Sequence, residues 1–169
     1  MSHTFSLFVV ASVAASFPTQ ATADCNALLD ALQKADAHDR LAQYEVERAD
    51  APLPSNPALV RIGKTEYVAM SVGGRVSHYE RHDSPAGGNP IGALRRGAKD
   101  GNAKCQSAGS GTVHGSAADK IRVEGKALPQ MTVWIDKRSG LPLYHEVPAL
   151  GIGYAWAFGD AVKEPKAGR

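Results

Sequence analysis

The stretch VWIDKRSGLPLYHE, residues 133–146, has the clearest pattern in the chain. Side chains alternate between the two faces of a strand, so Val133 and Ile135 share one face while Trp134 points to the other. KRSG then supplies the polar and glycine residues of a tight turn, and LPLYHEV continues as a second alternating segment. The stretch therefore predicts a β-hairpin, and no catalytic motif falls within it.

A strand with large aromatic side chains follows the hairpin. GIGYAWAF, residues 151–158, places Ile152, Tyr154, Trp156 and Phe158 on one face and only glycine and alanine on the other. So large an apolar face needs a cover. Upstream, CNALLDALQKADAHDRL, residues 25–41, repeats leucine and alanine at helical spacing, so we expect an amphipathic helix there that covers part of this face.

The remaining patterned segments have the two-residue period of strands and are separated by Gly- and Pro-rich turns. We therefore predict a mainly β (α+β) fold, in which about eight strands form an antiparallel meander that curls around the N-terminal helix. One domain is expected over residues 24–163, followed by a flexible tail over 164–169. Residues 82–104 are rich in glycine and proline, which predicts a long loop with one short helical turn near 93–96.

The first 23 residues are predicted to be a cleaved signal peptide. FSLFVVASVAASF is an apolar run of the right length, and ATA at residues 21–23 gives a small-x-small cleavage pattern. The run is shorter than the roughly 20 residues of a membrane-spanning helix. MSHT lacks a positive charge, so a buried N-terminal helix stays open as an alternative, and Cys25 leaves a lipoprotein anchor open in principle. We expect a mature chain that starts at residue 24 and resides in the periplasm, without a transmembrane segment.

The two cysteines of the chain, Cys25 and Cys105, are predicted to form a disulfide, as paired cysteines in exported proteins commonly do. The bond would close a loop of about 80 residues and contribute roughly 4 kcal/mol through chain entropy. Free thiols, a redox pair or a shared metal are the alternatives, although CxxC is absent from the sequence.

The charges of the chain are mixed along its length, with a formal net charge of +2. This mixed distribution of charges lacks the clustered basic face of a nucleic-acid-binding protein, so we expect no nucleic-acid partner. It also lacks the polybasic segment of a membrane-surface protein.

The C-terminal part of the chain resembles the LolA/LppX-like superfamily of bacterial envelope proteins. The resemblance covers roughly the last 65 residues and rests on the hairpin TVWIDKRSGLP, on the preceding KCQSAGSGTVHGSAADKIRVEG, and on the aromatic strand that ends in FGDAVKEP. It implies a curved antiparallel half-barrel, with the N-terminal helix packed in its concave face as a lid over an apolar cavity. Members of the superfamily carry lipoproteins or lipids across the periplasm, and this chain resembles one of its small branches. It differs from the lipoprotein carriers in its shorter length, its single clear helix and its expected disulfide. Their functional residues do not align with this chain outside the hairpin, so none is carried over.

A binding or carrier protein for a hydrophobic ligand is therefore the leading functional hypothesis. The ligand would be a lipid, an acyl chain or a lipoprotein anchor. The side chains expected to line the cavity are aromatic: Tyr67, Trp134, Tyr154, Trp156 and Phe158. One alternative is a non-catalytic envelope module with a filled core that binds another protein, and a second is a small enzyme on the same half-barrel.

Few residues of the chain form a pattern typical of catalysis. HYERH places His78, Glu80 and His82 on one strand face, where a zinc ion could bind, although such a face is more often simply solvated. His114 and His145 are interpreted as satisfied surface or turn groups. No GxSxG or GxGxxG motif is present. We assign no catalytic residue, no metal ligand and no cofactor.

Overall fold

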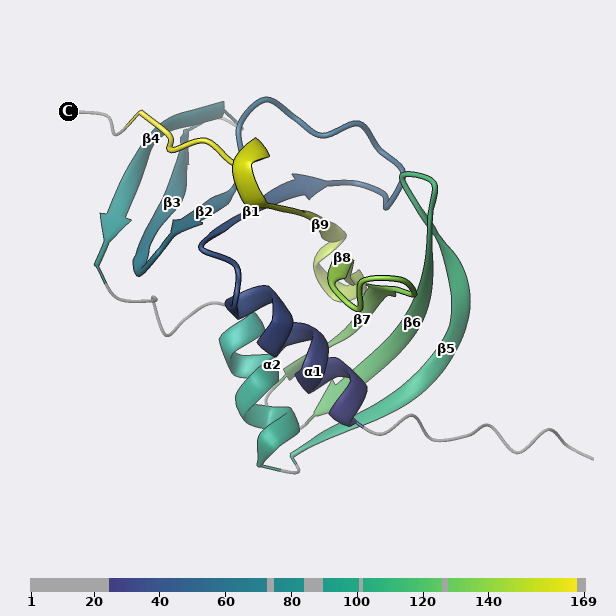
Figure 1. The fold of residues 1–169 in the computed structure, drawn as a ribbon. Coiled ribbons are helices and arrows are strands. Elements are labelled where there is room, and N and C mark those ends of the chain that lie inside the picture. The colour runs from purple at the N-terminus through teal and green to yellow at the C-terminus, as the bar shows by residue number, and fades with distance from the viewer. Residues whose placement is uncertain (1–24, 73–74, 84–89, 101, 126–127, 167–169) are drawn as a thin grey trace, which may run out of the picture.

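The computed structural model describes residues 25–72, 75–83, 90–100, 102–125 and 128–166. In these residues, nine antiparallel strands form one sheet with two helices packed against it (Figure 1). The elements in chain order are α1 (Cys25–Asp36), β1 (Arg40–Val46), β2 (Leu59–Ile62), β3 (Thr65–Val72), β4 (Arg75–His82), α2 (Pro90–Lys99), β5 (Ala103–Val113), β6 (Ser116–Gly125), β7 (Leu128–Asp136), β8 (Pro142–Val147) and β9 (Ile152–Phe158). The predicted signal peptide lies outside the described residues.

The strand order is β4-β3-β2-β1-β9-β8-β7-β6-β5, so every strand pairs with a sequence neighbour except at one junction. At that junction, β1 pairs with β9 from Leu41↔Phe158 to Val46↔Gly153 and joins the two ends of the chain. The predicted mainly β fold with a helix on the sheet is confirmed, with nine strands instead of about eight. The sheet is open, with β4 and β5 as its edges, and does not curl round into a barrel.

The hairpin of residues 133–146 forms as predicted, with Trp134 opposite Tyr144. Its turn is organised by Asp136, whose Oδ1 accepts hydrogen bonds from the backbone N–H groups of Ser139 and Arg138 and from the Ser139 hydroxyl. The two bonds from Ser139 are the main reason that the pKa of the Asp136 carboxyl lies below its usual value. Gly140 takes the left-handed φ of 70° that closes the turn.

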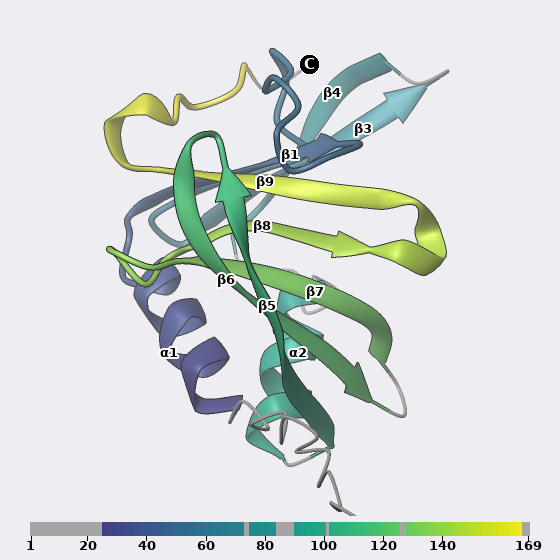
Figure 2. The ribbon, with the colours of Figure 1, turned by 90° about the vertical axis from the view of Figure 1, so that its right-hand side faces the viewer.

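Both helices lie on the same face of the sheet, beside β5 to β8 (Figure 1, Figure 2). Helix α1 buries its apolar stripe there through Leu28, Ala31, Leu32 and Ala35. The opposing strands contribute Ile121, Val123, Met131, Val133 and Ile135 to the same cluster. Helix α1 ends at Asp36, earlier than predicted. Arg61 of β2 donates hydrogen bonds to the carbonyl oxygens of Ala35 and His38 at that end.

The short helical turn predicted near 93–96 within the loop of residues 82–104 is part of a longer helix, because Pro90–Lys99 form α2. Two glycines within Pro90–Lys99 lower the intrinsic helix propensity of these residues, so the full helix was not evident from the sequence. Packing explains why it forms. Leu94 and Ala98, four residues apart, are buried in the cluster beneath α1, and Arg95 pairs with Asp36 of α1. Residues 84–89 lie outside the described part of the chain.

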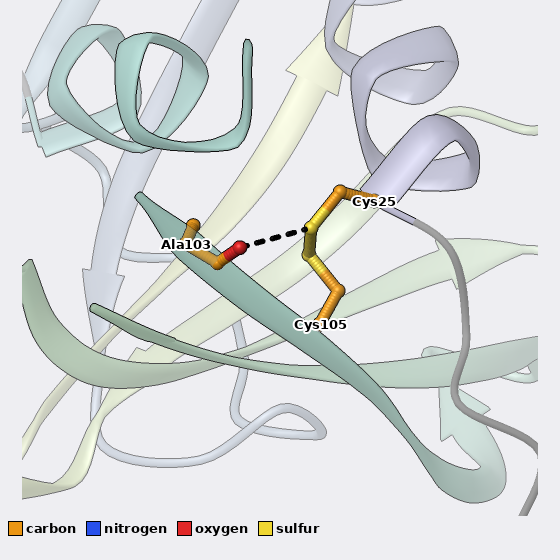
Figure 3. The surroundings of a disulfide bond; sticks show 3 residues. All are labelled: Cys25, Ala103 and Cys105. Carbon is orange, nitrogen blue, oxygen red and sulfur yellow. Dashed lines mark hydrogen bonds between the residues drawn. A yellow bond between two sulfur atoms is a disulfide. The ribbon is translucent and has the colours of Figure 1, made fainter. Parts of the chain in front are cut away.

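The predicted disulfide between Cys25 and Cys105 is present (Figure 3). It joins the first residue of α1 to β5, across a sequence separation of 80 residues. The Cys25 sulfur also lies 3.7 Å from the carbonyl oxygen of Ala103. This is a packing contact, because a disulfide sulfur has no proton to donate. The bond fixes one end of α1 to the sheet and is consistent with an extracytoplasmic location. None of the described helices is long and apolar enough to span a membrane.

We expect the double substitution Cys25→Ala/Cys105→Ala to lower the free energy of unfolding by about 4 kcal/mol, because the unfolded chain regains the entropy of a long loop. Urea denaturation followed by circular dichroism measures this change. The oxidised wild-type protein under the same conditions is the control. A double variant as stable as the wild type would show that the bond contributes nothing.

Candidate functional site

The structure divides the five predicted ligand-lining aromatic residues between the two faces of the sheet. Trp156 and Phe158 lie on the helix-covered face, in the cluster beneath α1 and α2, and Tyr154 belongs to the same face of β9. Trp134 and Tyr67 lie on the opposite face, in two separate clusters. The five residues therefore do not line one common cavity.

The aromatic rings on the helix-covered face form a continuous row across β8 and β9. The indole Nε1 of Trp156 donates a hydrogen bond of 2.9 Å to Nδ1 of His145. Tyr154 stacks on the imidazole with 5.0 Å between ring centroids, and Phe158 stacks on Trp156 at 6.0 Å. His145 is thus the centre of the row, because it contacts the rings on both sides.

His145 is 2% exposed, so its interpretation as a surface or turn group is wrong. Burial lowers the pKa of its imidazole to about 4, because the charged form would lose its hydration. At neutral pH the ring is therefore uncharged. Since Nδ1 accepts the bond from Trp156, the proton of the neutral ring sits on Nε2. In the strand pattern, His145 shares a face with Val147, which is buried. This shared face was the sequence signal for the burial of His145.

A small cavity of about 30 Å³ lies where α1 ends over the sheet. It has room for only one or two water molecules, whereas ligand pockets usually measure several hundred Å³. Its wall combines the apolar Leu32 and Trp156 with buried polar groups, and Asp36 pairs there with arginines from β2 and α2. The polar residues of the wall are Asp36, Gln43, Arg61, Glu66 and Arg95.

A larger pocket, of about 290 Å³, lies on the opposite face of the sheet. Trp134 and Tyr144 form part of its wall, with their rings in an edge-to-face contact at 5.3 Å. The ammonium group of Lys120 lies 4.3 Å from the centre of the Trp134 ring. The sequence pointed to Trp134 but not to this pocket, because residues 47–50, which follow β1, complete the wall.

Tyr67 belongs to a third location, at the C-terminal end of the chain. Its hydroxyl donates a short hydrogen bond to Glu164, which raises the pKa of Tyr67. The ring packs with Val60 and Val162. Tyr67 therefore links β3 to the residues after β9, and Glu164, in the predicted tail, has a defined partner.

The HYERH residues lie on the edge strand β4. His78 is exposed and its Nδ1 lies 3.0 Å from the Ser77 hydroxyl, while His82 lies 3.8 Å from Glu80. Tyr79 points to the other side and donates a hydrogen bond to the carbonyl oxygen of Pro57. In the described residues, no three His, Cys, Asp or Glu side chains are grouped as metal ligands would be.

Neither a known family model nor any curated protein matches this chain. The resemblance to LolA/LppX-like proteins therefore stays a prediction.

We expect the free energy of unfolding to fall as the pH is lowered from about 6.5 to 4, by about 3 kcal/mol from His145 alone. The pKa of the folded state lies below that of the unfolded state, so the unfolded chain takes up the proton first. The stabilisation is therefore complete above the unfolded pKa and is lost as the pH approaches the folded one.

Chemical denaturation at several pH values measures this effect, and His145→Asn is the matched variant. The asparagine oxygen can still accept the Trp156 hydrogen bond, but the side chain does not titrate. Carboxylates titrate alike in both proteins, so the difference between the two profiles isolates His145. Two parallel profiles would contradict the prediction.

Proposed function

We propose that the protein is a non-catalytic binding or carrier protein for a hydrophobic ligand, such as a lipid, an acyl chain or a lipoprotein anchor. The ligand lies between the sheet and its two helices, against Tyr154, Trp156 and Phe158. The observation that carries this proposal is the row of aromatic rings beneath the two helices.

The two helices of the cover are attached to the sheet in different ways. Helix α1 is held by the disulfide at its first residue. Only three residues separate its last residue, Asp36, from the first residue of β1, Arg40. Helix α2 has no such covalent bond and packs through Leu94, Ala98 and the ion pair of Arg95 with Asp36. Because the cavity of about 30 Å³ is too small for an acyl chain, binding requires α2 to move away from the sheet.

The periplasm is the proposed location. The disulfide supports it, since such bonds persist in oxidising compartments. The predicted signal peptide and the resemblance to LolA/LppX-like proteins point the same way.

A second candidate is an envelope protein that binds another protein and has a filled core. The small size of the cavity between α1 and the sheet favours it, because a permanently filled layer leaves no space for a ligand.

Mass spectrometry under native conditions separates the two candidates. The full chain is exported to a bacterial periplasm and purified without detergent. For a carrier, we expect an added mass that organic extraction removes. A bare mass would favour the filled-core alternative.

The two tryptophans of the chain then locate the ligand, because one lies on each face of the sheet. We expect 11-bromoundecanoic acid, whose bromine quenches indole fluorescence on contact, to quench Trp156 in the Trp134→Phe variant. Trp134 in the Trp156→Phe variant serves as the control and keeps its emission. Quenching of Trp134 alone, or of neither residue, would contradict a ligand beneath the helices.

A further inference from the structure

The pocket of about 290 Å³ on the face opposite the helices is independent of the proposed carrier site. Its volume is close to the lower limit of small-molecule sites. Its wall brings together two aromatic side chains from β7 and β8 with charged residues from β8 and from the segment that follows β1. The residues that matter for recognition are Glu47, Arg48, Asp50, Trp134, Tyr144 and Glu146.

The charges of this pocket are unbalanced. Arg48 pairs with Asp50 at 3.1 Å, and both side chains are largely exposed. Glu47 and Glu146 form no salt bridge with any other described residue. The pocket therefore presents two uncompensated carboxylates beside an aromatic wall. The pKa of Tyr144 is raised mainly by burial and further by Glu146, so the Glu146 charge acts on that wall.

Trp134 adds a hydrogen-bond donor that is not used. Its Nε1 is the one buried side-chain polar atom of the described residues that has no hydrogen-bond partner. A buried donor without an acceptor costs free energy that a ligand with an acceptor restores. Lys120 lies 4.3 Å from the centre of the Trp134 ring, so one face of the indole is already occupied.

We propose that this pocket binds a small organic cation that carries both an apolar group and a hydrogen-bond acceptor. The cation lies between Glu47 and Glu146, and the apolar group packs against Trp134 and Tyr144. Since Nε1 is buried, the indole must turn toward the pocket to meet the acceptor. The two carboxylates attract the positive charge, and the aromatic wall offers contact area to the apolar group.

Nuclear magnetic resonance of the ¹⁵N-labelled full-length protein tests the proposal. The two indole N–H resonances are assigned with the Trp134→Phe variant. Leucine methyl ester is the probe, because it combines an ammonium group, a branched apolar chain and a carbonyl acceptor. N-acetyl-leucine methyl ester lacks the charge, and isopentylamine lacks the acceptor. The Trp156 resonance is the internal control, since its N–H is already bonded to His145.

We expect leucine methyl ester to shift the Trp134 resonance saturably and to leave that of Trp156 in place. Glu47→Gln and Glu146→Gln should each weaken binding about two- to fivefold, as expected for partly exposed ion pairs. Glu124→Gln, an exposed residue outside the pocket wall, should have no effect. The neutral ester should bind roughly tenfold more weakly, since both carboxylate contacts are lost, and isopentylamine should also bind more weakly.

Several results would overturn the proposal. These are the absence of a saturable Trp134 shift, equal binding of the neutral ester, and Glu47 or Glu146 variants that behave like Glu124→Gln. Isopentylamine binding as tightly as the ester would overturn the role of the acceptor. None of these results bears on ligand binding beneath the helices, which involves the other face of the sheet.

Discussion

The pairing of β1 with β9 is the contact on which the rest of the structure depends. It joins the four strands that precede α2 to the five that follow it, and without it the sheet would be two separate pieces. Both faces gain from the junction. On the helix side, Leu41 of β1 and Trp156 of β9 enter the same buried cluster. On the other side, Tyr44 of β1 packs in a cluster with Ala155 and Tyr144.

The small residues of β9 matter as much as its large ones. Gly153 faces away from the helices, and a Cβ atom there would overlap the side chain of Tyr144. Tyr144 in turn contacts the edge of Trp134, so the aromatic wall of the pocket on this face depends on a glycine in the neighbouring strand. The same strand thus carries the ring row beneath the helices and leaves space for large residues on its opposite side.

Much of the fold could be predicted because alternation along a strand is a local property. It correctly assigned Val133 and Trp134 to opposite faces and Trp156 to the helix-covered face. Only one turn of helix α2 could be predicted, because the stability of the full helix comes from tertiary packing of Leu94 and Ala98 and its glycines obscure the pattern. Burial of His145 was missed because a polar residue in an alternating strand reveals its face but not its partner, which is Trp156 on β9.

The site was harder to predict than the fold, because it depends on which faces meet in three dimensions. Grouping Trp134 with Trp156 required one shared cavity, and the sheet lies between them. The pocket beside Trp134 also uses Glu47 and Asp50, which are distant in sequence and belong to no recognisable motif. Long-range pairing therefore decides the site, whereas local periodicity decides the strands.

The position of β9 at the centre of the sheet and near the end of the chain constrains the order of folding. During synthesis, β1 emerges early and has no second neighbour until β9 follows. Contacts of such high sequence separation form slowly. The incomplete chain therefore exposes the edges of β1 and β8, which are later covered, and it cannot reach the native sheet prematurely. Until this late closing strand arrives, the unfinished chain is a target for edge-to-edge aggregation.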